Sequence, residues 1–242
     1  MKHIGILAHS VPGAALCFRE CGEEGMRLLG GHNHPDVSLD CIAMGASMEA
    51  WESGDHDRIR AILAASVERL ARAGADFFVC PDNTAHLALE RPGPEFTLPG
   101  LHIADVVARS AVEAGHRTVG VLGTKWTMEA DLYPRAFGAY GIETRVPDPD
   151  ERDVIQGLTF GELVHGVFTD RARETFVSTI ERLRQAGCDA VALVCTEFPL
   201  LVTPEVSTLP TLESTTLAAR SAIRLAVGDD DLPAWRGGAV RA

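Results

Sequence analysis

Two residues that can move protons stand at matching places in two similar stretches of the chain. Residues 70–84 (LARAGADFFVCPDNT) align with residues 183–197 (LRQAGCDAVALVCTE) at an offset of 113, from 70 to 183, and this alignment brings Asp82 onto Cys195. Both follow a short apolar run, and open α/β sheets bind ligands beyond the carboxyl ends of such strands. An acid and a base on opposite faces of one carbon can invert its configuration, because one removes a proton while the other delivers one.

Asp82 and Cys195 differ strongly in proton affinity. Ordinary pKa values are about 3.9 for aspartate and about 8.5 for cysteine, so the resting pair at neutral pH is a carboxylate and a thiol. Asp82 is then the base and Cys195 the acid, and the reverse arrangement lies roughly 6 kcal/mol higher. Burial raises the pKa of an aspartate and a helix N-terminus lowers that of a cysteine, so the folded protein can narrow this difference.

The elements that must position these residues alternate along the chain. Runs rich in Val, Ile and Leu predict strands at residues 3–10, 37–44, 75–81, 117–124, 143–147 and 189–195. Apolar residues at three- and four-residue spacing predict helices at 56–74 and 172–187, and both end in Ala-Gly. Nearly continuous apolar strands that alternate with helices are typical of parallel sheets covered on both faces.

The repeat predicts two similar doubly wound α/β lobes. The opening strands also pair, residues 4–9 with 119–124, at an offset of 115. We expect parallel sheets, pseudo-twofold symmetry between the lobes and an active site in the cleft between them; convergence on a common helix–strand motif is the alternative explanation of the repeat. The predicted bounds are 1–100 plus about 205–228 for the first lobe, 101–204 for the second, a returning loop at 92–100 and a flexible tail at 229–242.

The composition excludes several classes of protein. The 242 residues carry 22 Lys and Arg against 34 Asp and Glu, a net charge of −12 without a basic stripe, so we expect no nucleic-acid partner. No apolar run approaches the roughly 18 residues of a membrane span and the first residues predict a strand, so we expect no membrane association and a cytoplasmic location. Cys17 and Cys21 share a helix face without further ligands at metal-site spacing, so we expect packing residues and no metal.

Three blocks of the sequence resemble the aspartate/glutamate racemase superfamily, whose members work without pyridoxal phosphate. Residues 73–86 (AGADFFVCPDNTAH) resemble its first signature, residues 121–133 (VLGTKWTMEADLY) its middle block, and residues 187–201 (GCDAVALVCTEFPLL) its second signature. The blocks occur in the family's order and the resemblance covers nearly the whole chain. It implies a two-lobed α/β fold, an isomerase activity without a cofactor, a small-molecule carboxylate substrate and a homodimer.

The chain departs from the family pattern at the first of two catalytic cysteines. Asp82 occupies the position of that cysteine, whereas Cys195 matches the second one. Cys80 lies two residues before Asp82, with the same facing but one pleat deeper in the strand. We interpret Cys80 as a packing residue, with substitution for the missing thiol as the alternative.

Residues beside these two are candidates for binding the substrate. The resemblance implies that Asn83 and Thr84 hold the substrate carboxylate, with Thr196 as their counterpart, and helix capping is the alternative role. Thr124 ends the family's Gly-Thr turn and is a further candidate. Three further residues are candidates for contacting the substrate, each with an alternative role: Ser10 as a turn residue, Lys125 as a surface lysine and Glu197 as an acceptor for backbone N–H groups. For His9 a role in the site and a structural role are both possible, whereas His86 is expected to be structural.

The distribution of cations limits the substrate. The resemblance implies that aspartate racemases hold the side-chain carboxylate with an Arg and a Lys, and the matching positions here fall near Met48 and His165. Residues 41–57 contain no Arg or Lys. Because a second carboxylate would be desolvated without a cation and repelled by Asp82, we expect a substrate with one carboxylate or with a neutral or cationic tail.

Two other functions stay open at this point. Arylmalonate decarboxylase belongs to the same superfamily and likewise lacks the first cysteine, so a decarboxylase or lyase with Cys195 as sole proton donor is the main alternative. The charge of Asp82 opposes a carboxylate leaving group, which favours isomerisation. A small-molecule binding protein without chemistry is the third interpretation.

Overall fold

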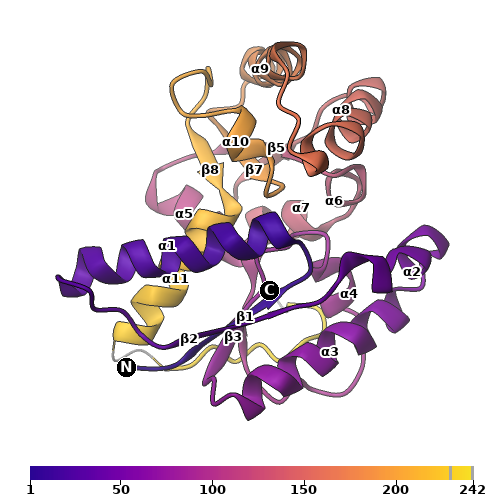
Figure 1. The fold of residues 1–242 in the computed structure, drawn as a ribbon. Helices are drawn as coiled ribbons and strands as arrows, with labels where there is room; N and C mark the ends of the chain where they lie inside the picture. Colours follow the sequence, from indigo (N-terminus) through magenta and orange to yellow (C-terminus); the bar gives the residue numbers. More distant parts are fainter. Residues whose placement is uncertain (229–230, 241–242) are drawn as a thin grey trace. The chain divides into compact units, whose positions relative to one another are not determined.

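Two four-stranded parallel sheets organise the computed structural model, which describes residues 1–228 and 231–240 (Figure 1). One sheet belongs to a unit of residues 1–106 with the described part of 215–242, and the other to a unit of residues 107–214. The predicted α/β class with two parallel sheets is therefore confirmed. Within the described residues, no helix combines the length and apolar character needed to cross a membrane.

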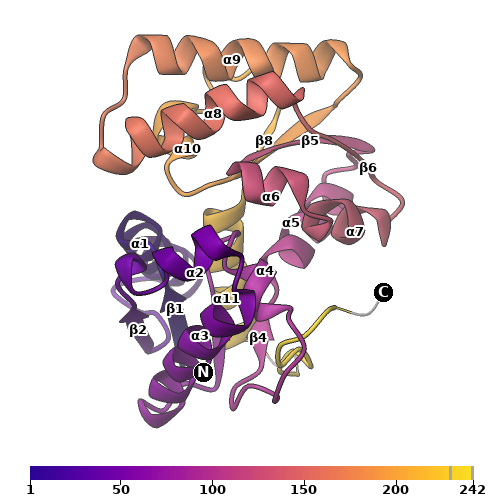
Figure 2. The same ribbon diagram turned by 90° about the vertical axis from the view of Figure 1, so that its right-hand side faces the viewer.

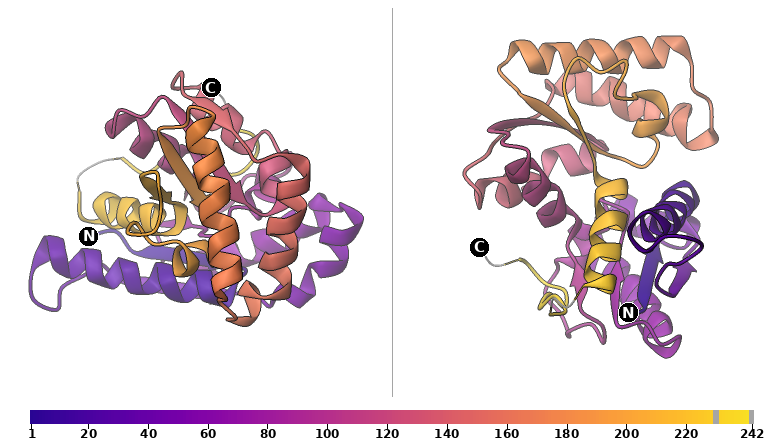
Figure 3. Two further views of the ribbon diagram at one scale, coloured as in Figure 1. Left: turned by 90° about the horizontal axis from the view of Figure 1, so that it is seen from above. Right: turned by 90° about the vertical axis from the view of Figure 1, so that its left-hand side faces the viewer.

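The sheet of the first unit has the order β2-β1-β3-β4 and is covered on both faces. Its strands are β1 (Ile4–Ala8), β2 (Val37–Cys41), β3 (Phe77–Val79) and β4 (Gly100–Leu101). Alternate side chains of β1 point to opposite faces of the sheet. Ile4 and Ile6 pack on one face with α1 (Val11–Leu29) and α11 (Ser214–Val227). Leu7 packs on the other face with α3 (His56–Arg72). Figure 3 shows α1 and α11 side by side. Three shorter helices complete the unit, namely α2 (Met48–Ser53), α4 (His86–Leu89) and α5 (Ile103–Glu113), which continues into the second unit.

The sheet of the second unit has the corresponding order β6-β5-β7-β8. Its strands are β5 (Thr118–Gly123), β6 (Glu143–Arg145), β7 (Ala190–Val194) and β8 (Thr211–Glu213). The helices α8 (Pro149–Gly161) and α9 (Asp170–Gln185) run along each other in Figure 2 and bury Ile155 and Phe176 against Leu122 and Leu193 of the sheet. The short helices are α6 (Lys125–Glu129), α7 (Leu132–Gly138) and α10 (Phe198–Leu201).

The internal repeat is visible in the pairing of the strands. In the first unit β1 pairs with β3 through Ile4 and Phe77, and in the second β5 pairs with β7 through Val119 and Ala190. Ile4 and Val119 are 115 residues apart and Phe77 and Ala190 are 113 apart, the same offsets as in the sequence alignment. Asp82 and Cys195 therefore follow equivalent strands in equivalent register.

The repeated aspartates have a local structural role. Asp76 accepts a hydrogen bond from the backbone N–H of His3 at 2.6 Å, and Asp189 accepts one from the backbone N–H of Arg117 at 2.8 Å. Each carboxylate thus satisfies a donor at the start of the neighbouring strand, where the sheet leaves it unpaired. The aspartate after each Ala-Gly pair therefore has the same role in both units: it accepts a hydrogen bond from the backbone just before the central strand.

The two long predicted helices end as expected. Helix α3 ends at Arg72 and α9 ends at Gln185, and the glycines of the following Ala-Gly pairs have φ values of +91° at Gly74 and +97° at Gly187. A side chain at either glycine would be strained, because this left-handed region is disfavoured for residues with a Cβ.

Two strands and one boundary differ from the sequence prediction. β4 and β8, of two and three residues, were not predicted as strands, and β4 begins at the end of the expected loop 92–100. Thr211 of β8 pairs with Val191, so residues 205–214 belong to the second unit rather than the first. Phe96, inside the expected loop 92–100, is only 3% exposed and packs in the core beside α3.

The C-terminal segment 231–240 packs on the first unit instead of forming the expected flexible tail; residues 229–230 and 241–242 of that expectation lie outside the described residues. Trp235 lies against Phe78, with ring centroids 5.8 Å apart, and against His102 at 5.0 Å. Its carbonyl accepts a hydrogen bond from the N–H of Gly100 at 2.8 Å. The indole closes a core that the sheet and α3 leave open.

Replacing Trp235 with alanine is expected to lower the free energy of unfolding by about 2 kcal/mol, less than the 3–5 kcal/mol of a fully buried tryptophan because the side chain is only partly buried. Chemical denaturation measures this change. Leu232→Ala, in the same segment but 40% exposed, is the matched control and should change stability by less than about 0.5 kcal/mol. Equal effects of both changes would contradict a specific role for Trp235.

Candidate active site

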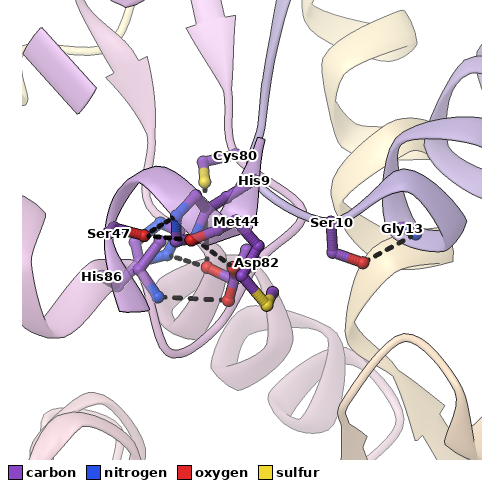
Figure 4. A network of polar contacts seen from close by, with 9 residues as sticks. His9, Ser10, Gly13, Met44, Ser47, Cys80, Asp82 and His86 are labelled. Carbon is purple, nitrogen blue, oxygen red and sulfur yellow. Dashed lines mark hydrogen bonds and ion pairs between the residues drawn. The ribbon is translucent and has the colours of Figure 1, made fainter. Parts of the chain in front are cut away.

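The polar residues of the first unit gather at the carboxyl ends of β1 and β3. His9 directly follows β1 and Asp82 follows β3, and these strands are neighbours in the sheet. The two side chains point toward each other in Figure 4, with His9 Nδ1 3.3 Å from Asp82 Oδ2. Parallel strands bring their carboxyl ends to one edge, which is how two residues 73 positions apart come into contact.

The carboxyl group of Asp82 has a partner on each oxygen. His9 contacts Oδ2, and the backbone N–H of Ala85 donates to Oδ1 at 3.1 Å. The side chain of Asp82 is 14% exposed whereas that of His9 is 1% exposed. Only the carboxyl group of this pair therefore reaches the surface of the unit.

Burial raises the pKa of Asp82, but the hydrogen bond and charge of His9 and the N–H of Ala85 outweigh it, so this pKa lies below its ordinary value. The sequence-based expectation was that burial would raise the pKa of Asp82 toward that of Cys195, and this expectation is wrong for Asp82. The physical reason is that stabilisation of the carboxylate by His9 exceeds the cost of desolvation. Asp82 is therefore a carboxylate at neutral pH.

His9 is fixed by a second contact. Its Nε2 lies 2.5 Å from Ser47 Oγ, and Ser47 Oγ lies 3.0 Å from the carbonyl oxygen of Met44 (Figure 4). Ser47 is fully buried and connects the 3₁₀ turn Met44–Ala46 to α2. The sequence prediction missed Ser47 and left His9 open; the position of His9 at a strand end was the only available signal.

His86 is structural, as the sequence predicted. Its Nδ1 lies 2.9 Å from the carbonyl oxygen of Asp82, and its Nε2 lies 3.3 Å from the backbone N–H of Ile103. Since a carbonyl only accepts and an N–H only donates, Nδ1 carries the proton and the ring is neutral. Burial, together with the nearby His102, lowers the pKa of His86 to about 3. His86 thus holds the turn that carries Asp82.

Cys80 is a packing residue. Its side chain is fully buried in the core with α3, and its Sγ lies 3.8 Å from the carbonyl oxygen of Asp82. Burial raises the pKa of the Cys80 thiol well above its ordinary value, with a further contribution from the charge of Asp82. A thiol held in this form does not replace the missing first cysteine of the family.

In the second unit, Cys195 directly follows β7 and its Sγ lies 3.1 Å from Glu197 Oε2. Cys195 is partly exposed, whereas Glu197 is 5% exposed. The thiol donates to a carboxylate, so a proton acceptor stands beside the sulfur. Glu197 was predicted to contact the substrate; the structure gives it Cys195 as a partner.

Three candidate binding residues have local structural partners. Ser10 caps α1 by accepting from the N–H of Gly13 at 3.4 Å, and Thr124 caps α6 by accepting from the N–H of Thr127 at 3.3 Å. Lys125 forms an ion pair with Asp153 at 2.5 Å, and its side chain is 37% exposed. As substrate contacts these three stay predictions, with the charge of Lys125 already matched.

The remaining candidates lie where the sequence places them. Asn83 and Thr84 follow Asp82 ahead of the single turn of α4, and Thr196 follows Cys195 ahead of α10. Asn83 is 2% exposed and Thr196 is 7% exposed. Within the residues that the structure describes, no group of three or more His, Cys, Asp or Glu side chains is arranged to hold a metal ion.

Comparison with known proteins places these features in a family. The family model described as Asp/Glu/Hydantoin racemase matches residues 23–222. The broad specificity amino-acid racemase RacX of Bacillus subtilis is 24% identical over 170 residues, which cover 70% of this chain and 73% of that protein. The glutamate racemase of Mycobacterium leprae is 31% identical over 148 residues, 59% of this chain and 52% of that protein, so this chain spans about half the length of that relative.

Solved structures agree with this comparison. An aspartate racemase homologue from Pyrococcus horikoshii OT3 is 28% identical with a TM-score of 0.79, covering 94% of this chain and 100% of that one. The aspartate racemase of Picrophilus torridus, at 22% identity and a TM-score of 0.74, shares the fold over 93% of this chain and 94% of its own. The family model covers more than half of the sequence, and the signature blocks of the chain lie within it. The chain therefore belongs to the Asp/Glu/Hydantoin racemase family, and it is an isomerase.

Proposed function

We propose that this protein is a cofactor-independent racemase or epimerase of an amino acid or related carbon acid, in which Asp82 and Cys195 move the proton. The observation that carries the proposal is that both residues follow equivalent strands, each with its own polar partner. Asp82 removes the α-proton of one enantiomer as a carboxylate, and Cys195 delivers a proton to the opposite face as a thiol.

The reverse reaction uses the same groups with their protons exchanged. Cys195 then starts as a thiolate, with Glu197 beside the sulfur to take up the thiol proton, and Asp82 starts as a carboxylic acid. In this proposal Asn83, Thr84, Thr124 and Thr196 hold the substrate carboxylate, with Ser10 and Lys125 as further contacts. The resemblance also supports action as a homodimer.

The charge around Asp82 supports a substrate with a single carboxylate. His9 is fully engaged by Asp82 and Ser47, and residues 41–57, which supply Ser47, contain no Arg or Lys. A second carboxylate beside the ionised Asp82 would be repelled and uncompensated. RacX is named a broad specificity amino-acid racemase, which supports an amino acid as the substrate here.

A screen of amino acids in deuterated water tests this function. We expect loss of the α-proton NMR signal, together with formation of the opposite enantiomer on a chiral column, for amino acids with neutral or cationic side chains. Aspartate and glutamate should react at least about tenfold more slowly, which corresponds to roughly 1.4 kcal/mol of repulsion. Release of carbon dioxide from malonate-like compounds without any inversion would overturn the proposal in favour of a decarboxylase.

A further inference from the structure

We propose that His9 is a positioning residue for Asp82, and that this carboxyl group works as a base only as the exposed end of a Ser47–His9–Asp82 chain of hydrogen bonds. The inference rests on the proposed racemase function and concerns the same site. It follows from the contacts of these three residues in the first unit.

The first step is that His9 and Ala85 together fix the orientation of the carboxyl group. His9 Nδ1 is 3.3 Å from Oδ2, and the N–H of Ala85 is 3.1 Å from Oδ1. A carboxylate oxygen has two lone pairs, so accepting one such bond does not by itself prevent an oxygen from taking a proton. Loss of the His9 contact would free the carboxyl plane to rotate.

The second step is that Ser47 can satisfy His9 in two protonation states. When the imidazole is neutral with its proton on Nδ1, the hydroxyl of Ser47 donates to Nε2. When the imidazole is protonated, Nε2–H donates to Ser47, whose hydroxyl turns to the carbonyl of Met44, 3.0 Å away. His9, although its side chain is only 1% exposed, therefore keeps a hydrogen-bond partner on both nitrogens in either form.

The third step separates this chain from a hydrolytic triad, which has the same order of serine, histidine and aspartate. In a triad the serine meets the substrate. Here Ser47 is fully buried and Asp82, at 14% side-chain exposure, is the member that can be reached. A substrate proton is therefore exchanged at the carboxyl group, and the histidine supports it from behind.

The other groups near Asp82 in the first unit do not replace this contact. The N–H of Ala85 donates to Oδ1 and leaves Oδ2 to His9. The charge of His86 lowers the pKa of Asp82 less than His9 does, and both nitrogens of His86 are committed to backbone partners. Cys80, which follows β3, lies 3.8 Å from the carbonyl oxygen of Asp82 and not against its carboxyl group. His9 is thus the imidazole that contacts the carboxyl group of Asp82 in the described part of this unit.

Two isosteric variants dissect the role of His9. In His9→Asn the side-chain amide can replace Nδ1 and still donate to Asp82, but it cannot reach Ser47. In His9→Gln the amide can replace Nε2 and contact Ser47, but it offers Asp82 no donor. Ser47→Ala leaves the His9–Asp82 contact in place and removes the partner of Nε2.

The readout is the pH profile of kcat/KM for inversion. In His9→Gln we expect the acidic limb to move to higher pH by at least about one unit, because a buried carboxylate without its donor binds a proton more tightly. In His9→Asn the acidic limb of the kcat/KM profile should lie close to its position in the wild type. In Ser47→Ala the acidic limb should move to higher pH by less than it does in His9→Gln. Identical profiles in His9→Asn and His9→Gln would overturn the proposal, since a core-filling histidine would leave the limb unmoved.

A titration of the Asp82 carboxyl carbon by 13C NMR gives a readout that does not require activity. The midpoint should lie higher in His9→Gln than in the wild type. If this shift occurs but the wild type exchanges no α-proton, the proposed function fails while the His9–Asp82 pairing stands. If exchange occurs and the midpoint does not move, the pairing fails while the racemase function stands.

Discussion

Replacing Cys195 with serine is expected to lower the rate of inversion by about 10²–10⁴-fold, the usual contribution of a positioned acid or base. A hydroxyl is a far weaker acid than a thiol, although it fills nearly the same space. Because the two enantiomers of a racemase substrate have equal free energies, kcat/KM for inversion must fall equally in both directions. Chiral chromatography of both reactions measures this loss.

Deuterium exchange at the α-carbon of the substrate distinguishes the roles of Asp82 and Cys195 in the Cys195→Ser variant. The enantiomer whose α-hydrogen faces Asp82 should still exchange with solvent in Cys195→Ser, whereas its mirror image should not. Cys188→Ser is a matched control, because Cys188 is a buried thiol of the same unit that packs in the core beside α9. Full inversion by Cys195→Ser would remove Cys195 from the mechanism.

Replacing Asp82 with asparagine is expected to lower inversion by a similar factor, about 10²–10⁴-fold. The amide has the size of the carboxyl group, and its oxygen can still accept from His9, so the unit should keep its fold; circular dichroism during thermal melting checks this. The pattern of exchange should be opposite to that of Cys195→Ser, since the face served by Cys195 is the one that remains. A decarboxylase with Cys195 as sole donor would instead tolerate Asp82→Asn.

The pH dependence of the wild type follows from the same carboxyl group. Asp82 is a base only while it is ionised, and burial raises its pKa less than His9 and Ala85 lower it. Activity that requires Asp82 as base should therefore persist as pH falls and be lost only below the ordinary aspartate pKa of about 3.9. Asp82→Asn should lack this acidic limb in its residual exchange. A limb above pH 5 in the wild type would contradict the lowered pKa.

Local patterns in the sequence were enough to predict much of this protein. The apolar runs marked six of the strands, and the Ala-Gly pairs marked the ends of α3 and α9. The aligned segments predicted that Asp82 and Cys195 follow equivalent strands, and the register of Ile4 with Phe77 and of Val119 with Ala190 confirms it. These features were readable because strand and helix periods, and the offset between two copies, are properties of neighbouring residues along the chain.

The direction in which the pKa of Asp82 is shifted was decided only by the tertiary structure. Its partner His9 lies 73 residues away and Ser47 lies 38 residues from His9, and neither distance leaves a pattern in the sequence. Trp235 likewise reaches its core from the far end of the chain, and β8 is recognised as a strand only by its pairing with β7. The sequence determined which groups stand at the strand ends, whereas their pKa values depend on the burial around them and on the hydrogen-bond partners that folding brings within about 3 Å, because neither leaves a local pattern along the chain.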